Sequence, residues 1–146
     1  MKIRNEIEMS AKVKLFGGAF ELLQSLRGEV KLGLASMSDR AVIKHMLKMT
    51  CTEPLFAVVV TADDVVNPKP SPEVFLKCAR KLKCSPKKCV VVEDSVFGVK
   101  AAKTAKMRCI AVLTGVHSRE RLDEAHPDLI INSLKEKRKV LNFIFQ

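Results

Sequence analysis

The sequence predicts a single α/β domain in which short buried strands alternate with helices. Three observations predict this class. Hydrophobic residues make up 47% of the 146 residues, which is enough for one domain with its own core. Short apolar runs of strand type alternate along the chain with stripes of helical spacing. Some of these runs end in polar residues directly before a helix, as strands do at the ligand-binding edge of an open parallel sheet.

The spacing of apolar residues defines the individual elements. The predicted helices cover residues 19–26, about 40–49, 74–82 and 135–145. The predicted strands cover residues 30–35, 56–60, 90–92 and 129–131. No run reaches the about 18 apolar residues that a membrane span needs, so we expect no membrane partner.

The strand from Val90 to Val92 delivers two adjacent carboxylates, Glu93 and Asp94, to its carboxyl end. Two acids held side by side repel each other unless a cation compensates, and Mg²⁺ prefers hard carboxylate oxygens. We therefore expect Glu93 and Asp94 to form part of a metal site. The alternative is an exposed acidic loop in which Asp94 or Ser95 caps the next helix.

Ser36 follows a short apolar strand and precedes a helix. A hydroxyl group beside the backbone N–H groups of a helix start forms a cradle for phosphate, so Ser36 is a candidate phosphate-binding residue. The alternative is that Ser36, Ser38 or Asp39 only caps the helix from about residue 40 to 49.

Lys69 lies between Pro68 and Pro70, which fix the backbone around it, and a new helix follows. The residues from Ser71 to Glu73 are typical of the N-cap, N1 and N2 positions of that helix. We expect a lysine held in this way to contact a specific group, whereas most isolated surface lysines are only solvated. We expect Lys69 to be partly exposed, so that Lys69→Met removes anion binding and scarcely changes stability.

Taken in order, these three elements resemble the core domain of the haloacid dehalogenase (HAD) superfamily. The resemblance is to the branch that contains β-phosphoglucomutase and small sugar-phosphate phosphatases, and it runs from about residue 14 to 136. It continues through a helix at 98–103, a strand at 109–113 followed by Thr114–Gly115, and the segment 128–134. It implies a Rossmann-like three-layer core with a parallel sheet.

The resemblance also implies roles in a Mg²⁺-dependent phosphatase that acts on a small phosphorylated metabolite. Ser36 matches the second motif, and its hydroxyl and the N–H groups of its loop, including that of Met37, would bind the phosphoryl oxygens. Lys69 matches the third motif and would neutralise charge between phosphate and nucleophile. Asp94 would hold Mg²⁺ and Glu93 would orient the metal shell. Lys69 and Ser36 are thus the predicted catalytic residues, converging near Asp94.

The first motif of the family has no match. That motif is a strand ending in Asp-x-Asp, which carries the nucleophile and the general acid/base, and no Asp-x-Asp occurs in this sequence. Residues 1–13 resemble the last helix of the cap domain of family members, and residues 14–146 resemble the core. We therefore expect a truncated member that lacks the nucleophile strand and most of the cap and is inactive as it stands. Weak or absent Mg²⁺ binding is expected for the same reason.

In the resembling fold the nucleophile strand lies between the strand that ends at Ser36 and the strand that ends at Glu93. Its absence predicts a gap lined by unpaired N–H and C=O groups, which are costly to bury. Three repairs avoid this cost: direct pairing of the two strands, a strand supplied by another segment or chain, or a loose or self-associating species. Residues 1–13 are too charged and too helical in pattern to be expected as this strand.

Two positions depart from the family pattern. Lys106 stands where relatives have the glycine of Ala-Gly-Met, and His126–Pro127 stands where a Gly-Ala pair is common. Such a glycine commonly ends a helix in the left-handed region, so Lys106 costs about 1 kcal/mol if it keeps that geometry.

The net charge of +10 comes largely from two clusters of cations. These are Lys77, Arg80, Lys81, Lys83, Lys87 and Lys88, and then Lys135, Lys137, Arg138 and Lys139. Such a field attracts phosphorylated substrates, anionic membranes or RNA. Because the sequence contains no Trp or Tyr for base stacking, we favour solvated helix faces over a nucleic-acid partner.

Several functions stay open at this point. The first is a HAD-like phosphatase that has lost its nucleophile; the alternatives are a basic binding or regulatory module and a phosphosugar mutase. The acid pair Asp63–Asp64 is a rival metal site. The five cysteines are odd in number and lack zinc-site spacing, which is typical of reduced thiols in a cytoplasmic protein.

Overall fold

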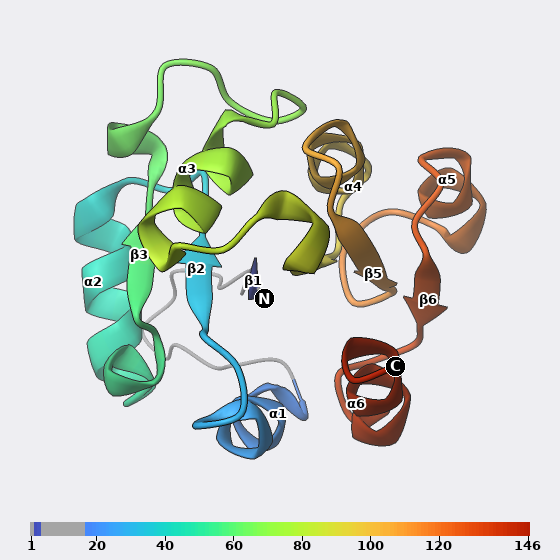
Figure 1. Cartoon of the computed structure of the whole chain (residues 1–146), viewed down its shortest axis with the longest axis horizontal. Helices are drawn as coiled ribbons and strands as arrows, with labels where there is room; N and C mark the ends of the chain where they lie inside the picture. The colour runs from blue at the N-terminus through green and yellow to red at the C-terminus, as the bar shows by residue number, and fades with distance from the viewer. Residues whose placement is uncertain (1, 4–16) are drawn as a thin grey trace.

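The computed structural model describes residues 2–3 and 17–146, which form a six-stranded parallel sheet with helices on both faces (Figure 1). The strands are β1 (Lys2–Ile3), β2 (Gly33–Ala35), β3 (Val58–Val60), β4 (Val90–Glu93), β5 (Arg108–Val112) and β6 (Leu129–Ile131). Their order across the sheet is β3-β2-β1-β4-β5-β6. All five neighbouring pairs are parallel, so the carboxyl ends of the strands share one edge.

The helices of the described residues follow the strands in the expected alternation. They are α1 (Ala19–Leu26), α2 (Arg40–Met49), α3 (Glu73–Leu82), α4 (Val96–Thr104), α5 (Arg119–Glu124) and α6 (Lys137–Ile144). Three short 3₁₀ turns lie between them: η1 (Glu53–Leu55), η2 (Ala62–Asp64) and η3 (Pro86–Lys88). No helix in this part of the chain combines the length and the apolar character needed to span a membrane.

The hydrophobic core has two parts, one on each face of the sheet. Helices α1, α2 and α6 contribute Leu22, Ile43 and Val140 to one part. Helices α3, α4 and α5 contribute Phe75, Val99 and Leu122 to the other. The predicted α/β class and three-layer architecture are therefore confirmed.

The predicted element bounds agree closely in the first half of the chain. Helices α1 and α2 have the predicted bounds, whereas strands β2 and β3 begin later than predicted, at Gly33 and Val58. Val30 instead forms an isolated bridge with Arg27, because the chain is still turning after α1. Helix α3 begins at Glu73 with Pro72 at the N-cap, so the predicted cap positions were one residue early.

The predicted gap in the sheet is filled by the start of the chain. Lys2 and Ile3 pair with Gly33 and Leu34 of β2 and with Val91 and Val92 of β4. The expectation that residues 1–13 would not supply a central strand is wrong for these two residues. Local charge and helical pattern are overridden here because the facing strands need backbone partners. The remainder of the proposed cap remnant, residues 1 and 4–13, lies outside the described residues.

The cysteines are all free, and Cys78, Cys89 and Cys109 are buried. Burial raises the pKa of the Cys109 thiol, and the nearby carboxylates of Glu93 and Asp128 raise it further. The Cys109 thiol therefore stays protonated and behaves as a small core residue, as the sequence predicted.

Two residues that follow helices adopt the left-handed backbone conformation, which the sequence analysis considered for Lys106. Lys106 after α4 has φ +65°, and His126 after α5 has φ +60°. Both residues therefore adopt the left-handed conformation that favours glycine.

We expect Lys106→Gly and His126→Gly each to raise the free energy of unfolding by about 1 kcal/mol, because glycine removes the left-handed penalty. Urea unfolding followed by circular dichroism measures the change. Lys106→Ala and His126→Ala are the matched controls, since they shorten the side chain but keep the penalty. Equal effects of Gly and Ala would contradict this explanation.

Candidate functional site at the carboxyl edge of the sheet

Ser36 lies immediately after β2, at the carboxyl edge of the sheet, and is 3% exposed. Its hydroxyl oxygen accepts a hydrogen bond from the N–H of Ser38 at 3.1 Å. The helix cap is a different residue: the Asp39 carboxylate accepts from the N–H of Val42 at 3.0 Å. Of the residues considered as caps, Asp39 therefore caps α2, and Ser36 remains a residue of the loop.

The loop after β2 offers a specific backbone donor. The N–H of Ser36 donates to the carbonyl of Val60, and the N–H of Ser38 donates to the Ser36 hydroxyl. Met37, between them, makes no backbone hydrogen bond to any residue that the structure describes. The Met37 N–H is thus a donor of this loop that an anion could use.

Lys69 forms a buried ion pair with Glu93. The ammonium nitrogen lies 2.8 Å from a Glu93 carboxylate oxygen, and the two side chains are 4% and 0% exposed. The same ammonium lies 4.8 Å from the centre of the Phe75 ring, a cation–π distance. The expectation that Lys69 is partly exposed is therefore wrong: the lysine points inward because Glu93 is buried and charged.

The loop that carries Lys69 is fastened to α3 through Glu73. The Glu73 carboxylate accepts hydrogen bonds from the N–H of Asn67 at 2.8 Å and from the N–H of Val66 at 3.0 Å. These hydrogen bonds lower the pKa of Glu73, because they stabilise its charged form. The position of Lys69 is thus set by two contacts: Glu73 holds the backbone of its loop, and Glu93 holds its ammonium group.

Glycine is required where Glu93 meets helix α4. A Cβ atom at Gly98 would lie 1.6 Å from the Glu93 carboxylate oxygen Oε2. Any other residue at this position would therefore displace the carboxylate that holds Lys69.

Asp94 is 6% exposed and lies beside Gly115, a residue of the loop between β5 and α5. A Cβ atom at Gly115 would come within 2.9 Å of the Asp94 carbonyl oxygen and 3.2 Å of its carboxylate. The predicted placement of Asp94 at the strand end is thus observed, and Gly115 permits the close approach.

The start of α4, next to Asp94, has two caps. The Ser95 hydroxyl accepts from the N–H of Gly98 at 3.0 Å, and Nδ1 of His117 accepts from the N–H of Val96 at 2.8 Å. Ser95, not Asp94, is therefore the side-chain cap considered in the sequence analysis. The contribution of His117 was missed, although its place two residues after Gly115 already put it at the carboxyl edge of the sheet.

The rival acid pair has structural partners. Asp63 accepts from the N–H of Arg40 at 2.9 Å, and Asp64 accepts from the N–H of Thr61 at 2.8 Å and pairs with the Arg40 guanidinium. Burial raises the pKa of Asp64, but the hydrogen bonds from Thr61 and Arg40 outweigh it and the net shift is downward. These contacts fasten η2 to the start of α2, which is a sufficient role for both acids.

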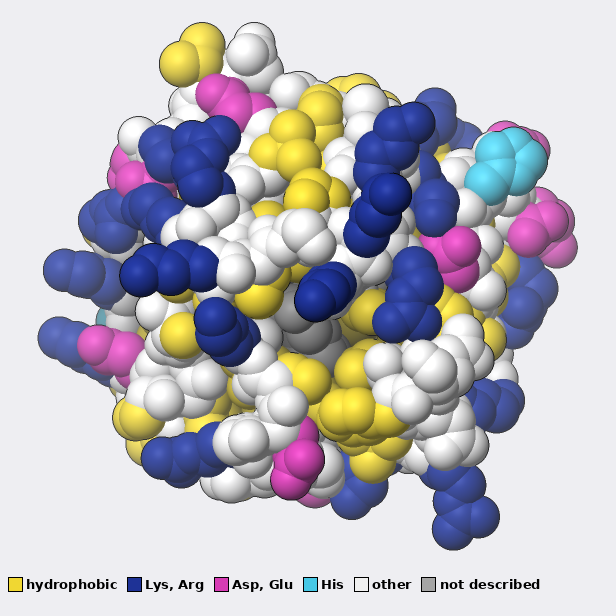
Figure 2. Space-filling model, viewed as in Figure 1, with side chains coloured by type: hydrophobic (Ala, Val, Ile, Leu, Met, Phe, Trp, Pro, Cys, Tyr) yellow, Lys and Arg dark blue, Asp and Glu magenta, His cyan; other side chains and the backbone are white. Residues whose placement is uncertain are grey.

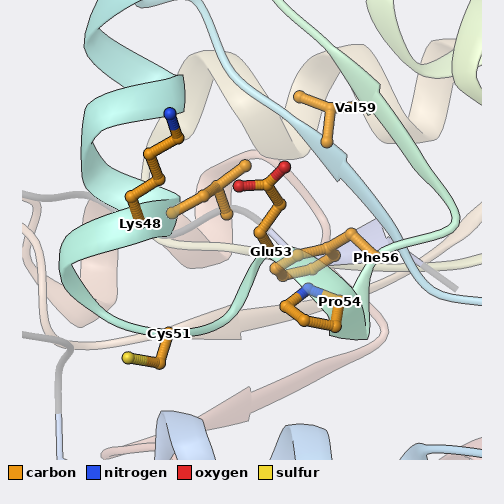
Figure 3. Close-up of a pocket in the computed structure, with 7 residues that line it drawn as sticks. Lys48, Cys51, Glu53, Pro54, Phe56 and Val59 are labelled. Carbon is orange, nitrogen blue, oxygen red and sulfur yellow. The ribbon is translucent and has the colours of Figure 1, made fainter.

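A hollow elsewhere on the surface does not belong to this site. It is lined by residues of the α2 end, η1 and β3: Leu47, Lys48, Cys51, Glu53, Pro54, Phe56 and Val59 (Figure 3). None of the candidate phosphate or metal residues lines it.

The donor set fits Mg²⁺ only in part. No group of three or more His, Cys, Asp or Glu side chains is arranged for a metal ion within residues 2–3 and 17–146. Mg²⁺ demands about six oxygen ligands, commonly including one or two carboxylates and a substrate phosphate. Because Lys69 engages Glu93, Asp94 is the carboxylate best suited to hold Mg²⁺, and alone it supplies a small share of the ligand shell.

We expect Lys69→Met to lower the free energy of unfolding by about 3–5 kcal/mol, because it leaves the Glu93 charge buried without its cation. Glu93→Gln should be destabilising for the reciprocal reason, and the double variant should lose much less than the sum of the two. Urea unfolding of the four proteins gives the coupling. Lys81→Met, at an exposed position, is the control and should change the stability by less than about 0.5 kcal/mol. Equal losses for Lys69→Met and Lys81→Met would contradict the burial of the pair.

The hydrogen bonds of Glu73 predict a pH-dependent loop. A carboxyl with a lowered pKa in the fold contributes stability above its unfolded value of 4.5 and loses it as the pH falls through the folded value. In an NMR titration, the Val66 and Asn67 amide signals should therefore shift with a midpoint below 4.5. Glu73→Gln should abolish this titration and Glu53→Gln should preserve it; a midpoint at or above the ordinary value would be the opposite result.

Comparisons with known proteins identify what this chain is similar to. The sequence matches the profile of the family described as haloacid dehalogenase-like hydrolase over residues 1–112. A phosphorylated carbohydrates phosphatase of Thermotoga maritima is 37% identical over 125 residues, which is 81% of this chain and 57% of that protein. The chloroplastic protein SUPPRESSOR OF QUENCHING 1 of Arabidopsis thaliana is 39% identical over 117 residues, which is 79% of this chain and 11% of that protein.

Solved structures give the same relationship. A putative beta-phosphoglucomutase from Thermotoga maritima has a TM-score of 0.84 at 31% identity, covering 92% of this chain and 62% of that one. The chain thus spans less than two thirds of each of these three proteins. The profile match covers most of the chain and includes the strand ends that carry Ser36 and Glu93. This chain belongs to the haloacid dehalogenase-like hydrolase family.

Proposed function

We propose that this chain binds the phosphate of a small phosphorylated metabolite and, as the 146-residue polypeptide, does not hydrolyse it. The observation that carries the binding half is the inward-facing Lys69, held on Glu93 at 2.8 Å at the sheet edge where Ser36 and Asp94 also lie. A cation fixed at this edge, with a hydroxyl and a loop N–H supplied by the neighbouring strand end, suits a phosphoryl group.

Each residue has a distinct part in this proposal. Ser36 donates its hydroxyl proton to a phosphoryl oxygen while its oxygen accepts from Ser38, and Met37 donates its N–H. Lys69 offsets the negative charge of the phosphate. Glu93 positions Lys69, which differs from the role of orienting a metal shell that the resemblance implied.

We expect this chain to bind Mg²⁺ weakly. Asp94 would hold it together with oxygens of the bound phosphate, and the ion would supply further neutralisation of phosphate charge. Without a phosphate ligand we expect no Mg²⁺ binding at ordinary millimolar concentrations.

The inactive half of the proposal rests on the missing motif. Phosphate-ester hydrolysis by members of this family requires a carboxylate oxygen to attack phosphorus and a second carboxyl to protonate the leaving oxygen. The six aspartates are Asp39, Asp63, Asp64, Asp94, Asp123 and Asp128, and no two of them have the Asp-x-Asp spacing. A mutase would need the same nucleophile, so the same absence applies to that alternative.

The substrate class follows from the relatives, not from the described site. The names of two similar proteins, a phosphorylated carbohydrates phosphatase and a putative beta-phosphoglucomutase, support a sugar phosphate. Cytoplasmic location and self-association through exposed sheet edges remain predictions of the same proposal.

The proposal is tested by separating binding from turnover. In a titration with inorganic phosphate followed by NMR, we expect the Met37 amide signal to shift, because its N–H would donate to the anion. Ser36→Ala should weaken binding about tenfold, the effect of one hydrogen bond to a charged group. The double variant Lys69→Met/Glu93→Gln should abolish binding, and Lys81→Met should leave it unchanged. No shift at Met37 would contradict the binding half.

Turnover is measured with para-nitrophenyl phosphate, with and without Mg²⁺. We expect no release of nitrophenol above that of a protein-free solution. Mg²⁺-dependent release that Lys69→Met/Glu93→Gln removes would contradict the inactive half and leave the binding half intact.

A further inference from the structure

One stretch of the chain carries many cations and no exposed acid. Eleven Lys and Arg residues lie between Val74 and Arg119: Lys77, Arg80, Lys81, Lys83, Lys87, Lys88, Lys100, Lys103, Lys106, Arg108 and Arg119. The same stretch holds two acids, Glu93 and Asp94, and both are buried. Much of the excess positive charge therefore belongs to α3, η3, α4 and their flanking residues.

Most of these cations have no side-chain partner among the described residues. Four of them contact other groups: Lys77, Lys103, Arg108 and Arg119. The other seven are exposed and make no side-chain hydrogen bond or ion pair with the part of the chain that the structure describes: Arg80, Lys81, Lys83, Lys87, Lys88, Lys100 and Lys106. We call these seven residues the basic face.

The fold brings the basic face together on one side of the sheet. Helices α3 and α4 contact each other and bury their apolar sides in the same core part (Figure 1). The space-filling view of this side shows Lys and Arg side chains spread over it, with few acidic ones between them (Figure 2). Because η3 precedes β4 and Glu93 ends it, Lys87 and Lys88 lie at the edge opposite the candidate phosphate site.

The charge and the composition of the basic face indicate which class of partner it would bind. Seven like charges on neighbouring elements repel one another, and a polyanion relieves this repulsion at many points at once, which a metabolite with a single phosphate cannot do. Stable attachment to a bilayer needs an apolar anchor as well as charge. The exposed large hydrophobic residue of α3, η3 and α4 is Phe97, in the first turn of α4, whereas Lys106 follows the other end of that helix.

We propose that the basic face binds the phosphate backbone of a double-stranded nucleic acid without reading its sequence. Six of its seven cations are lysines, which act as point charges on phosphate and lack the planar fork that reads guanine. The missing Trp and Tyr disfavour a stacking platform for single strands, which was the reason to doubt a nucleic-acid partner, but duplex binding needs no stacking. This inference goes beyond the proposed function and uses none of its residues.

The test is fluorescence anisotropy with a labelled mixed-sequence duplex at two salt concentrations. We expect binding whose log K falls with log salt with a slope of about −3 to −6, at about 0.9 per neutralised phosphate. Lys81→Glu/Lys87→Glu/Lys88→Glu should weaken binding at least tenfold at low salt. A second duplex of unrelated sequence should bind equally.

A matched control distinguishes an effect of net charge from an effect of the basic face itself. Lys44→Glu/Lys48→Glu/Lys137→Glu changes the charge by the same amount on the helices of the other face, α2 and α6, and should retain affinity within about threefold. Equal loss in both triple variants, no binding by the unmodified chain, or tighter binding to phosphatidylserine vesicles than to the duplex would overturn the proposal. Circular dichroism confirms that both variants are folded, and Arg80→Gln/Lys81→Gln/Lys100→Gln repeats the test without charge reversal.

Discussion

The buried contact between the Lys69 ammonium and the Glu93 carboxylate ties together the parts of the site that are distant in sequence. It joins the loop before α3 to the last residue of β4, across a distance of 24 residues along the chain. Two buried charges are tolerable only together, because each alone would carry an uncompensated desolvation cost. Glu73, which fastens the loop, and Gly98, which leaves room for the carboxylate, are therefore conditions for the same pair.

This pair explains why stability and the proposed phosphate recognition cannot be separated at Lys69. In a partly exposed position the lysine could be replaced with little loss of stability. At 4% exposure, its removal leaves the buried Glu93 carboxylate without its cation. Asp94 is held by other means, through the close approach of Gly115 and the capped start of α4. The carboxylate proposed to hold Mg²⁺ and the cation proposed to meet phosphate are thus held by different contacts at one edge of the sheet.

Local sequence pattern predicted the features that depend on local physics. Apolar spacing located α1 and α2, and the polar residues after apolar runs located Ser36 and Glu93 at strand ends. The pattern failed where distant backbone decides the outcome: Lys2 and Ile3 become strand because β2 and β4 face them, not because of their own propensity. The burial of Lys69 and the cap from His117 were likewise missed, since both arise from contacts between segments more than twenty residues apart.

The direction of the helices accounts for the separation between the anion site and the basic face. In a parallel α/β sheet the helices that follow strands begin at the carboxyl edge, so the positive ends of α2 and α4 lie at the edge of the proposed phosphate site. Their negative ends lie at the other edge, where Lys83 and Lys106 follow α3 and α4. Cations at helix carboxyl ends are favourable, which offsets part of the repulsion among the lysines. The fold can therefore carry unpaired positive charge at that edge without weakening the site at the opposite one.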